Sequence, residues 1–154
     1  MKIEAEVGKI LRNGKMTMAV AESCTGGLIS SRITDISGSS DFFSMGIVAY
    51  SNKIKENVLG VFPKLLQKHG AVSKQVALEM AKGARLLANT DIGIGITGIA
   101  GPTGGTMTKP VGLVYIALSM DKKKIAKKFF FKGSRQKIKF QASEAALDLI
   151  IKNG

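Results

Sequence analysis

A serine and a cysteine stand side by side in the segment AESCTGG at residues 21–27. The apolar run before this segment predicts a buried strand, and LISSRITDI after it predicts a helix. Ligands of α/β sheets bind at the carboxyl ends of strands, and a helix N-terminus offers free N–H groups to a developing oxyanion. Ser23 is therefore a candidate nucleophile, with backbone donors near Thr25 and Gly26. The alternative is that Ser23 or Thr25 only caps the helix.

Cys24 is the rival nucleophile in this segment. A catalytic cysteine needs a partner that lowers its pKa, and that partner is usually a histidine. The chain has one histidine, His69, and its place before Gly70 at the end of a predicted helix favours a structural role. We therefore expect Cys24 to pack in the interior rather than to react.

A serine nucleophile without a histidine needs another base, and AYSNKIK at residues 49–55 offers Tyr50 and Lys55. Free lysine has a pKa of about 10.4, so it becomes a useful base only when burial or a nearby cation lowers that pKa. Ser–Lys hydrolases use a lysine in this way, and a tyrosine can relay the proton. The alternative is a solvated surface lysine, which applies equally to Lys53, Lys55 and Lys64.

Glycines are frequent in a third segment, TGIAGPTGGTMTKPVG at residues 97–112, which follows a predicted strand. Glycine-rich loops expose backbone N–H groups that bind phosphate or another anion. The segment is not a P-loop, because no GK[ST] follows, and it does not open a helix as the fingerprint GxGxxG does. An ordinary loop is the alternative, although long loops inside compact domains more often have a function.

Strands and helices alternate along the chain and predict the scaffold for these segments. Strands are expected at 16–21, 45–51, 91–97, 111–119 and 124–132, the last two as an antiparallel pair. Helices are expected at 4–12, 28–36, 52–59, 63–68, 76–88 and 136–151, with Ser73 as an N-cap. We expect one α/β domain over residues 1–154, with three α/β/α layers and a mixed sheet of five or six strands.

The composition is typical of a soluble globular protein. Apolar residues make up 45% of the chain, and no stretch of 18 apolar residues predicts a membrane span. The N-terminal segment contains acids and lacks the long apolar stretch of a secretory signal, so we expect a cytoplasmic location. A single cysteine excludes an internal disulfide, and one cysteine with one histidine argues against a zinc site.

The net charge of +12 is concentrated near the C-terminus, where residues 122–139 contain nine basic residues and no acid. A basic block of this kind can bind nucleic acid. The alternative is a solvated strand and loop. The same positive field would also favour a phosphorylated small substrate.

These three segments, taken with GSSDFFSMGIVAYSNKIK at 38–55 and GAVS at 70–73, resemble the CinA C-terminal-domain family. The resemblance runs from about residue 4 to residue 150. It implies the activity of the family's enzymatic members, the nicotinamide-nucleotide amidases. These enzymes convert nicotinamide mononucleotide and water to nicotinic acid mononucleotide and ammonia. The resemblance implies no metal and no organic cofactor.

The family pattern also implies roles for individual residues. Ser23 would be the nucleophile, and Tyr50 and Lys55 would act as its base. Arg135, in FKGSRQ at 131–136, would hold the substrate phosphate together with the glycine-rich loop. The pocket would further use four residues of the TGIAGP segment: Thr97, Gly98, Ala100 and Gly101.

Three features depart from the family pattern. Met107-Thr108 replaces a more polar pair, the segment at 122–132 is unusually rich in lysine, and Lys139 takes a position that is often arginine. None of them alters the expected catalytic residues. The resemblance does not include the molybdopterin-binding-like N-terminal domain of two-domain CinA proteins, so we expect none of that domain's activity from these residues.

The expected partners follow from this interpretation. We expect a homo-oligomer that acts on a phosphorylated small molecule, with no membrane partner and no nucleic acid. The alternative is a non-catalytic, competence-linked or nucleic-acid-binding accessory protein that uses the basic residues at 122–139. Such a protein would not require the set of Ser23, Tyr50 and Lys55.

Overall fold

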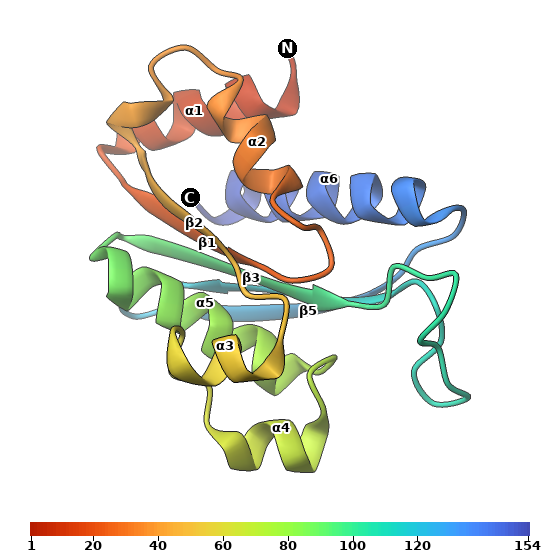
Figure 1. The fold of residues 1–154 in the computed structure, drawn as a ribbon. Coiled ribbons are helices and arrows are strands. Elements are labelled where there is room, and N and C mark those ends of the chain that lie inside the picture. Colours follow the sequence, from red (N-terminus) through yellow and green to blue (C-terminus); the bar gives the residue numbers. More distant parts are fainter.

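A mixed sheet of five strands crosses the computed structural model, which describes residues 1–154 (Figure 1). The strands lie in the order β2-β1-β3-β4-β5. β1 pairs in parallel with β2 and β3, whereas β4 is antiparallel to both β3 and β5. Their bounds are β1 (Met18–Glu22), β2 (Phe43–Val48), β3 (Ile92–Gly98), β4 (Leu113–Ser119) and β5 (Lys124–Phe130).

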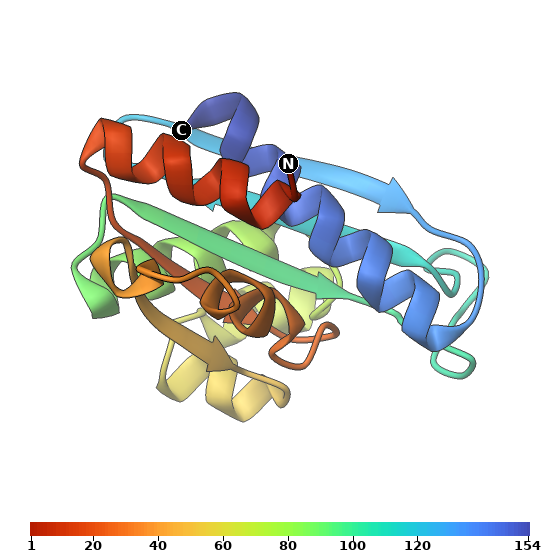
Figure 2. The ribbon, with the colours of Figure 1, turned by 90° about the horizontal axis from the view of Figure 1, so that it is seen from above.

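Helices cover both faces of this sheet (Figures 1 and 2). One face carries α1 (Ile3–Gly14), α2 (Leu28–Thr34) and α6 (Arg135–Asn153). The other face carries α3 (Asn52–Asn57), α4 (Pro63–His69) and α5 (Lys74–Ala88), and a 3₁₀ turn at Ser39–Asp41 precedes β2. The predicted three-layer α/β fold is therefore confirmed, with five strands. None of the helices combines the length and the apolar character that crossing a membrane would require.

Isoleucine and glycine alternate in β3, so its two faces pack against different helices. Its three isoleucines are fully buried in the larger hydrophobic core, which α1 and α6 complete. A Cβ added at Gly93 would lie 2.0 Å from the Ala81 carbonyl oxygen of α5. At Gly95 it would lie 2.4 Å from the Ala77 carbonyl oxygen. Glycine therefore allows α5 to lie directly on the backbone of β3, which places the start of this helix beside the carboxyl end of the strand.

β2 ends at Val48, three residues before the predicted end at residue 51. The Ala49 N–H still donates to the Glu22 carbonyl oxygen at 2.8 Å, after which the chain turns away from the sheet. The Ser51 side chain then caps α3. Tyr50 therefore lies in the connection between β2 and α3, next to the carboxyl end of β1.

Candidate active site

Ser23 directly follows β1, at the carboxyl end of the strand, where the sequence predicted it. Its N–H donates to the Ile96 carbonyl oxygen of β3 at 3.1 Å, which fixes the serine backbone to the sheet. Its Oγ lies 3.0 Å from Nζ of Lys55. Ser23 is buried but lines a cavity, so its hydroxyl has both a partner in the protein and access to a ligand.

The turn after Ser23 is fixed by the fully buried carboxylate of Glu22. This carboxylate accepts hydrogen bonds from the hydroxyl of Thr25 at 2.6 Å and from that of Ser30 at 2.7 Å. It also accepts from the backbone N–H groups of Ile29 and Ser30, both at 3.0 Å. Glu22 thus caps α2 from inside the protein. The N–H groups of Ile29 and Ser30 are therefore occupied, whereas those of Cys24 and Thr25 donate to no backbone acceptor. That donors near Thr25 serve an oxyanion stays a prediction.

Gly26 and Gly27 complete this turn with positive φ angles of 61° and 99°, which glycine adopts without strain. The Gly26 N–H donates to the Ser23 carbonyl oxygen at 3.1 Å. Thr25 is fully buried, and neither Thr25 nor Gly26 lines the cavity at Ser23. The geometry therefore does not support the prediction that these two residues contact the substrate. Their observed contacts hold the turn that presents Ser23.

Lys55 reaches Ser23 from the first turn of α3. Its Nζ also lies 2.9 Å from the Ala49 carbonyl oxygen and 3.4 Å from the Tyr50 carbonyl oxygen. The residue is 1% exposed, and burial lowers the pKa of its amine, because a charged ammonium is costly away from water. Lys53 and Lys64 are exposed. The surface-lysine alternative thus holds for Lys53 and Lys64, whereas Lys55 has the surroundings of a base.

Cys24 has the surroundings of an unreactive thiol. It is 6% exposed, and burial raises its pKa to about 12. His69 lies in the last turn of α4 and lines a different cavity, so no imidazole stands beside the thiol. Because the thiolate is the reactive species, this pKa disfavours Cys24 as the nucleophile.

The cavity over Ser23 has a volume of about 320 Å³, which suits a small molecule. Its walls come from the turn after β1, the start of α3, the segment before α5, the loop after β3 and the start of α6. The lining residues are Ser23, Cys24, Tyr50, Asn52, Lys55, Ala71, Val72, Thr97, Gly98, Ile99, Ala100, Gly101, Thr103, Gly104 and Arg135.

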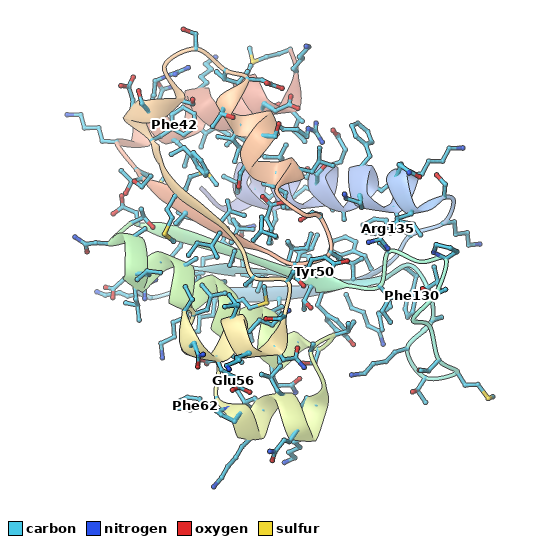
Figure 3. The ribbon with its side chains drawn as sticks, viewed as in Figure 1. Phe42, Tyr50, Glu56, Phe62, Phe130 and Arg135 are labelled. Carbon is cyan, nitrogen blue, oxygen red and sulfur yellow. The ribbon has the colours of Figure 1, made fainter.

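Arg135 and Tyr50 meet at the mouth of this cavity (Figure 3). The Arg135 guanidinium donates to the Tyr50 hydroxyl at 3.0 Å and to the Gly101 carbonyl oxygen at 2.7 Å. The Tyr50 side chain makes no hydrogen bond to Ser23 or Lys55, and only its carbonyl contacts Lys55. The proton relay predicted for Tyr50 is therefore not what this geometry favours, although the tyrosine does line the site.

The structure brings together eight of the residues that the sequence singled out: Ser23, Tyr50, Lys55, Thr97, Gly98, Ala100, Gly101 and Arg135. Sequence reasoning missed Glu22, whose signal was an acid at the end of an otherwise apolar strand. It also missed Asn52 and the pair Ala71 and Val72, although AYSNKIK and GAVS contain them. The Ala71 carbonyl oxygen accepts from the Thr97 hydroxyl at 2.9 Å, and only the fold reveals this contact.

The chain is similar to known proteins over almost its whole length. A family model described as the CinA C-terminal domain matches residues 1–153. A CinA-like protein from Syntrophus aciditrophicus is 50% identical over 149 residues, which is 96% of this chain and 36% of that protein. The chain thus spans about a third of the length of the curated relatives it matches.

Two solved structures share the fold. One is the competence/damage inducible protein CihA from Agrobacterium tumefaciens, with 37% identity and a TM-score of 0.92 over 97% of this chain and 94% of that one. The other is the competence damage-inducible protein A from Klebsiella pneumoniae, with 32% identity and a TM-score of 0.95 over 98% and 94%. This chain therefore belongs to the CinA C-terminal domain family.

Proposed function

We propose that this protein is a nicotinamide-nucleotide amidase, which hydrolyses nicotinamide mononucleotide to nicotinic acid mononucleotide and ammonia. The observation that supports this most directly is the 3.0 Å contact between Lys55 Nζ and Ser23 Oγ inside a small-molecule cavity. Membership of the CinA C-terminal domain family adds support. The relatives have names that describe competence or damage induction and specify no reaction.

The reaction begins with the neutral amine of Lys55, which burial favours. The Ser23 hydroxyl gives its proton to Lys55 Nζ, and Oγ bonds to the carboxamide carbon. The tetrahedral intermediate then expels its nitrogen, which takes the proton back from Lys55 and leaves as ammonia. Water next attacks the acyl-enzyme, Lys55 accepts the water proton, and Ser23 regains it as the acid product leaves.

Backbone N–H groups that line the cavity are the donors available to the oxyanion. Those of Cys24, Ala100 and Gly101 donate to no backbone acceptor, and all three residues are buried. Buried N–H groups rarely stay unpaired, so an oxygen of the substrate is a suitable partner. One such donor contributes roughly 3 kcal/mol to stabilisation of the transition state.

Arg135 is the group that we assign to the substrate phosphate. It is exposed at the mouth of the cavity, and its contacts with Gly101 and Tyr50 hold the guanidinium in place while leaving other N–H donors free. Arginine binds phosphate through parallel hydrogen bonds. In this scheme Tyr50 positions Arg135 through its hydroxyl and contacts Lys55 through its carbonyl.

An ammonia-release assay on nicotinamide mononucleotide tests the proposal. The wild-type protein should release ammonia and form nicotinic acid mononucleotide in equal amounts. Ser23→Ala should reduce the rate by at least about a thousandfold, since it removes the nucleophile, and it should leave the circular dichroism spectrum and the melting temperature close to those of the wild type. Mass spectrometry of the quenched reaction should find the acyl group on the peptide that contains Ser23. Absence of ammonia release by folded wild-type protein, or full activity of Ser23→Ala, would refute the proposal.

A further inference from the structure

A second cavity lies next to the catalytic one and is lined by cationic side chains. It has a volume of about 430 Å³, and its walls come from the end of α4, the start of α5, β4, β5 and the loop that contains Lys109. The lining includes four lysines and no acidic residue: Lys74, Lys109, Lys127 and Lys128. Lys74, Lys109 and the adjacent pair Lys127 and Lys128 come from three distant parts of the sequence, so the fold brings them together.

Two of the lysines have ammonium groups placed by contacts with residues that line this cavity. The Lys128 ammonium stands 6.0 Å from the centre of the Tyr115 ring, which lines the same cavity. The Lys109 ammonium donates to the His69 carbonyl oxygen, which fixes its position there and leaves other N–H donors free. Since no acid neutralises this group of cations, an anion would lower its electrostatic energy.

The start of α5 adds further donors to the same wall. Ser73 caps this helix, and Lys74 occupies its first turn, which contains no acidic residue. Negative charge is favoured at a helix N-terminus, so the start of α5 adds to the attraction for an anion. The helix has fifteen residues, and its N-terminus faces the same cavity as the lysines.

The cavity is distinct from the site at Ser23. Of all the lining residues, only Val72 is common to the two cavities. Neither Ser23 nor Arg135 lines the second cavity, and none of its four lysines lines the first. The segment that includes Ala71 and Val72 therefore forms a wall between them.

We propose that this second cavity binds a small molecule that bears two or more linked phosphate groups. Linked phosphates offer several anionic oxygens to Lys74, Lys109 and Lys128, whereas one carboxylate offers only two oxygens and a single charge. The site uses part of the basic block at 122–139 that the amidase reaction leaves unused. It does not depend on the amidase proposal, because no catalytic residue lines it.

Binding of inorganic tripolyphosphate, measured by isothermal titration calorimetry at fixed ionic strength, tests this site. The wild type should bind one tripolyphosphate, and the double variant Lys74→Ala/Lys128→Ala should weaken binding at least tenfold. The matched control is Lys122→Ala/Lys123→Ala, which removes the same charge from exposed lysines outside this cavity and should change the affinity less than twofold. Similar losses in both double variants would mean nonspecific attraction and would overturn the proposal.

Two further measurements locate the ligand. Tripolyphosphate should slow hydrogen exchange of the amides at 69–76 and 124–129, which border the second cavity. Arg135→Ala should leave tripolyphosphate affinity unchanged, because Arg135 lines only the catalytic cavity. Protection confined to 98–105, or loss of binding in Arg135→Ala, would place the anion in the catalytic cavity and overturn the proposal.

Discussion

The two cavities on either side of Val72 both contain lysines, yet these lysines differ in what they can do. Lys55 in the catalytic cavity is 1% exposed, and burial lowers its pKa toward the neutral form. Lys74 and Lys128 in the second cavity are exposed to water. In the two proposals, the buried lysine accepts a proton in one cavity and the exposed lysines supply positive charge in the other.

The groups that contact the lysines also differ between the two cavities. Lys55 Nζ has three oxygen acceptors within 3.4 Å, one of which is the hydroxyl of Ser23. Lys128 instead stands over the rings of Tyr115 and Phe130, which attract a cation and accept no proton. Lys55 is thus positioned to exchange a proton with the Ser23 hydroxyl. Lys128 has no such partner and can contribute only its positive charge.

The largest effect is expected from changing the buried lysine. Lys55→Ala should lower kcat/KM for nicotinamide mononucleotide by about 10²–10⁴-fold, the usual contribution of a general base. Lys55→Arg should be impaired to a similar extent, because arginine stays protonated. Lys53→Arg, on the exposed side of the same helix, is the control and should retain full activity. Steady-state kinetics and thermal melting of the three variants give the comparison, and an active Lys55→Arg would end the proton-transfer role.

The pH dependence of the wild type should show the lowered pKa of Lys55 directly. The neutral amine is the base, so kcat/KM should rise with pH and level off above the pKa of this group. Because burial lowers that pKa from the usual 10.5, the inflection should fall below 10.5. Kinetics between about pH 6 and pH 10 check this. A rate that is flat across this range would contradict the assignment.

A smaller effect is expected from Arg135, because we assign it to the substrate phosphate rather than to the reacting carbon. The wild type should prefer nicotinamide mononucleotide over its nucleoside by roughly a hundredfold in kcat/KM, since a charge-assisted contact contributes about 1.5–3 kcal/mol. Arg135→Ala should remove most of this preference and leave turnover of the nucleoside almost unchanged. Lys137→Ala, two residues along α6 and outside the cavity, is the matched control. Equal efficiency on both substrates in the wild type would contradict the phosphate assignment.

The sequence predicted the scaffold well because its signals are local. The alternation of isoleucine and glycine in β3 and the serine cap of α5 each depend on a few neighbouring residues. The sequence also predicted that Ser23 stands at a strand end and that Lys55 lies one turn into a helix. Residue types and spacing alone did not distinguish Lys55 from Lys53 and Lys64, because burial depends on how α3 packs against the rest of the protein. The family resemblance was what implied Lys55.

Other features of the site required the fold. In the sequence, Glu22 is only an acid at the end of a strand. In the structure its carboxylate accepts four hydrogen bonds from Thr25, Ile29 and Ser30, which follow it in the turn and in α2. For this reason the sequence could not show that the N–H groups of Ile29 and Ser30 are already occupied. The second cavity could not be predicted either, since Lys74, Lys109 and Lys128 meet only when α5, the long loop and β5 are placed together.

The smallest effect is expected from the residue beside the nucleophile. Cys24→Ala should retain at least about a third of the wild-type kcat/KM, because the substitution keeps the backbone N–H and removes only a thiol that does not act. With a pKa of about 12, that thiol is almost entirely protonated at neutral pH, so iodoacetamide should also alkylate it slowly in the folded protein. Denatured protein provides the control for alkylation, since the exposed cysteine should then react at its ordinary rate. An inactive Cys24→Ala alongside an active Ser23→Ala would assign the nucleophile to the thiol, and Lys55 would then have to act on sulfur rather than on the Ser23 oxygen to which it is hydrogen-bonded.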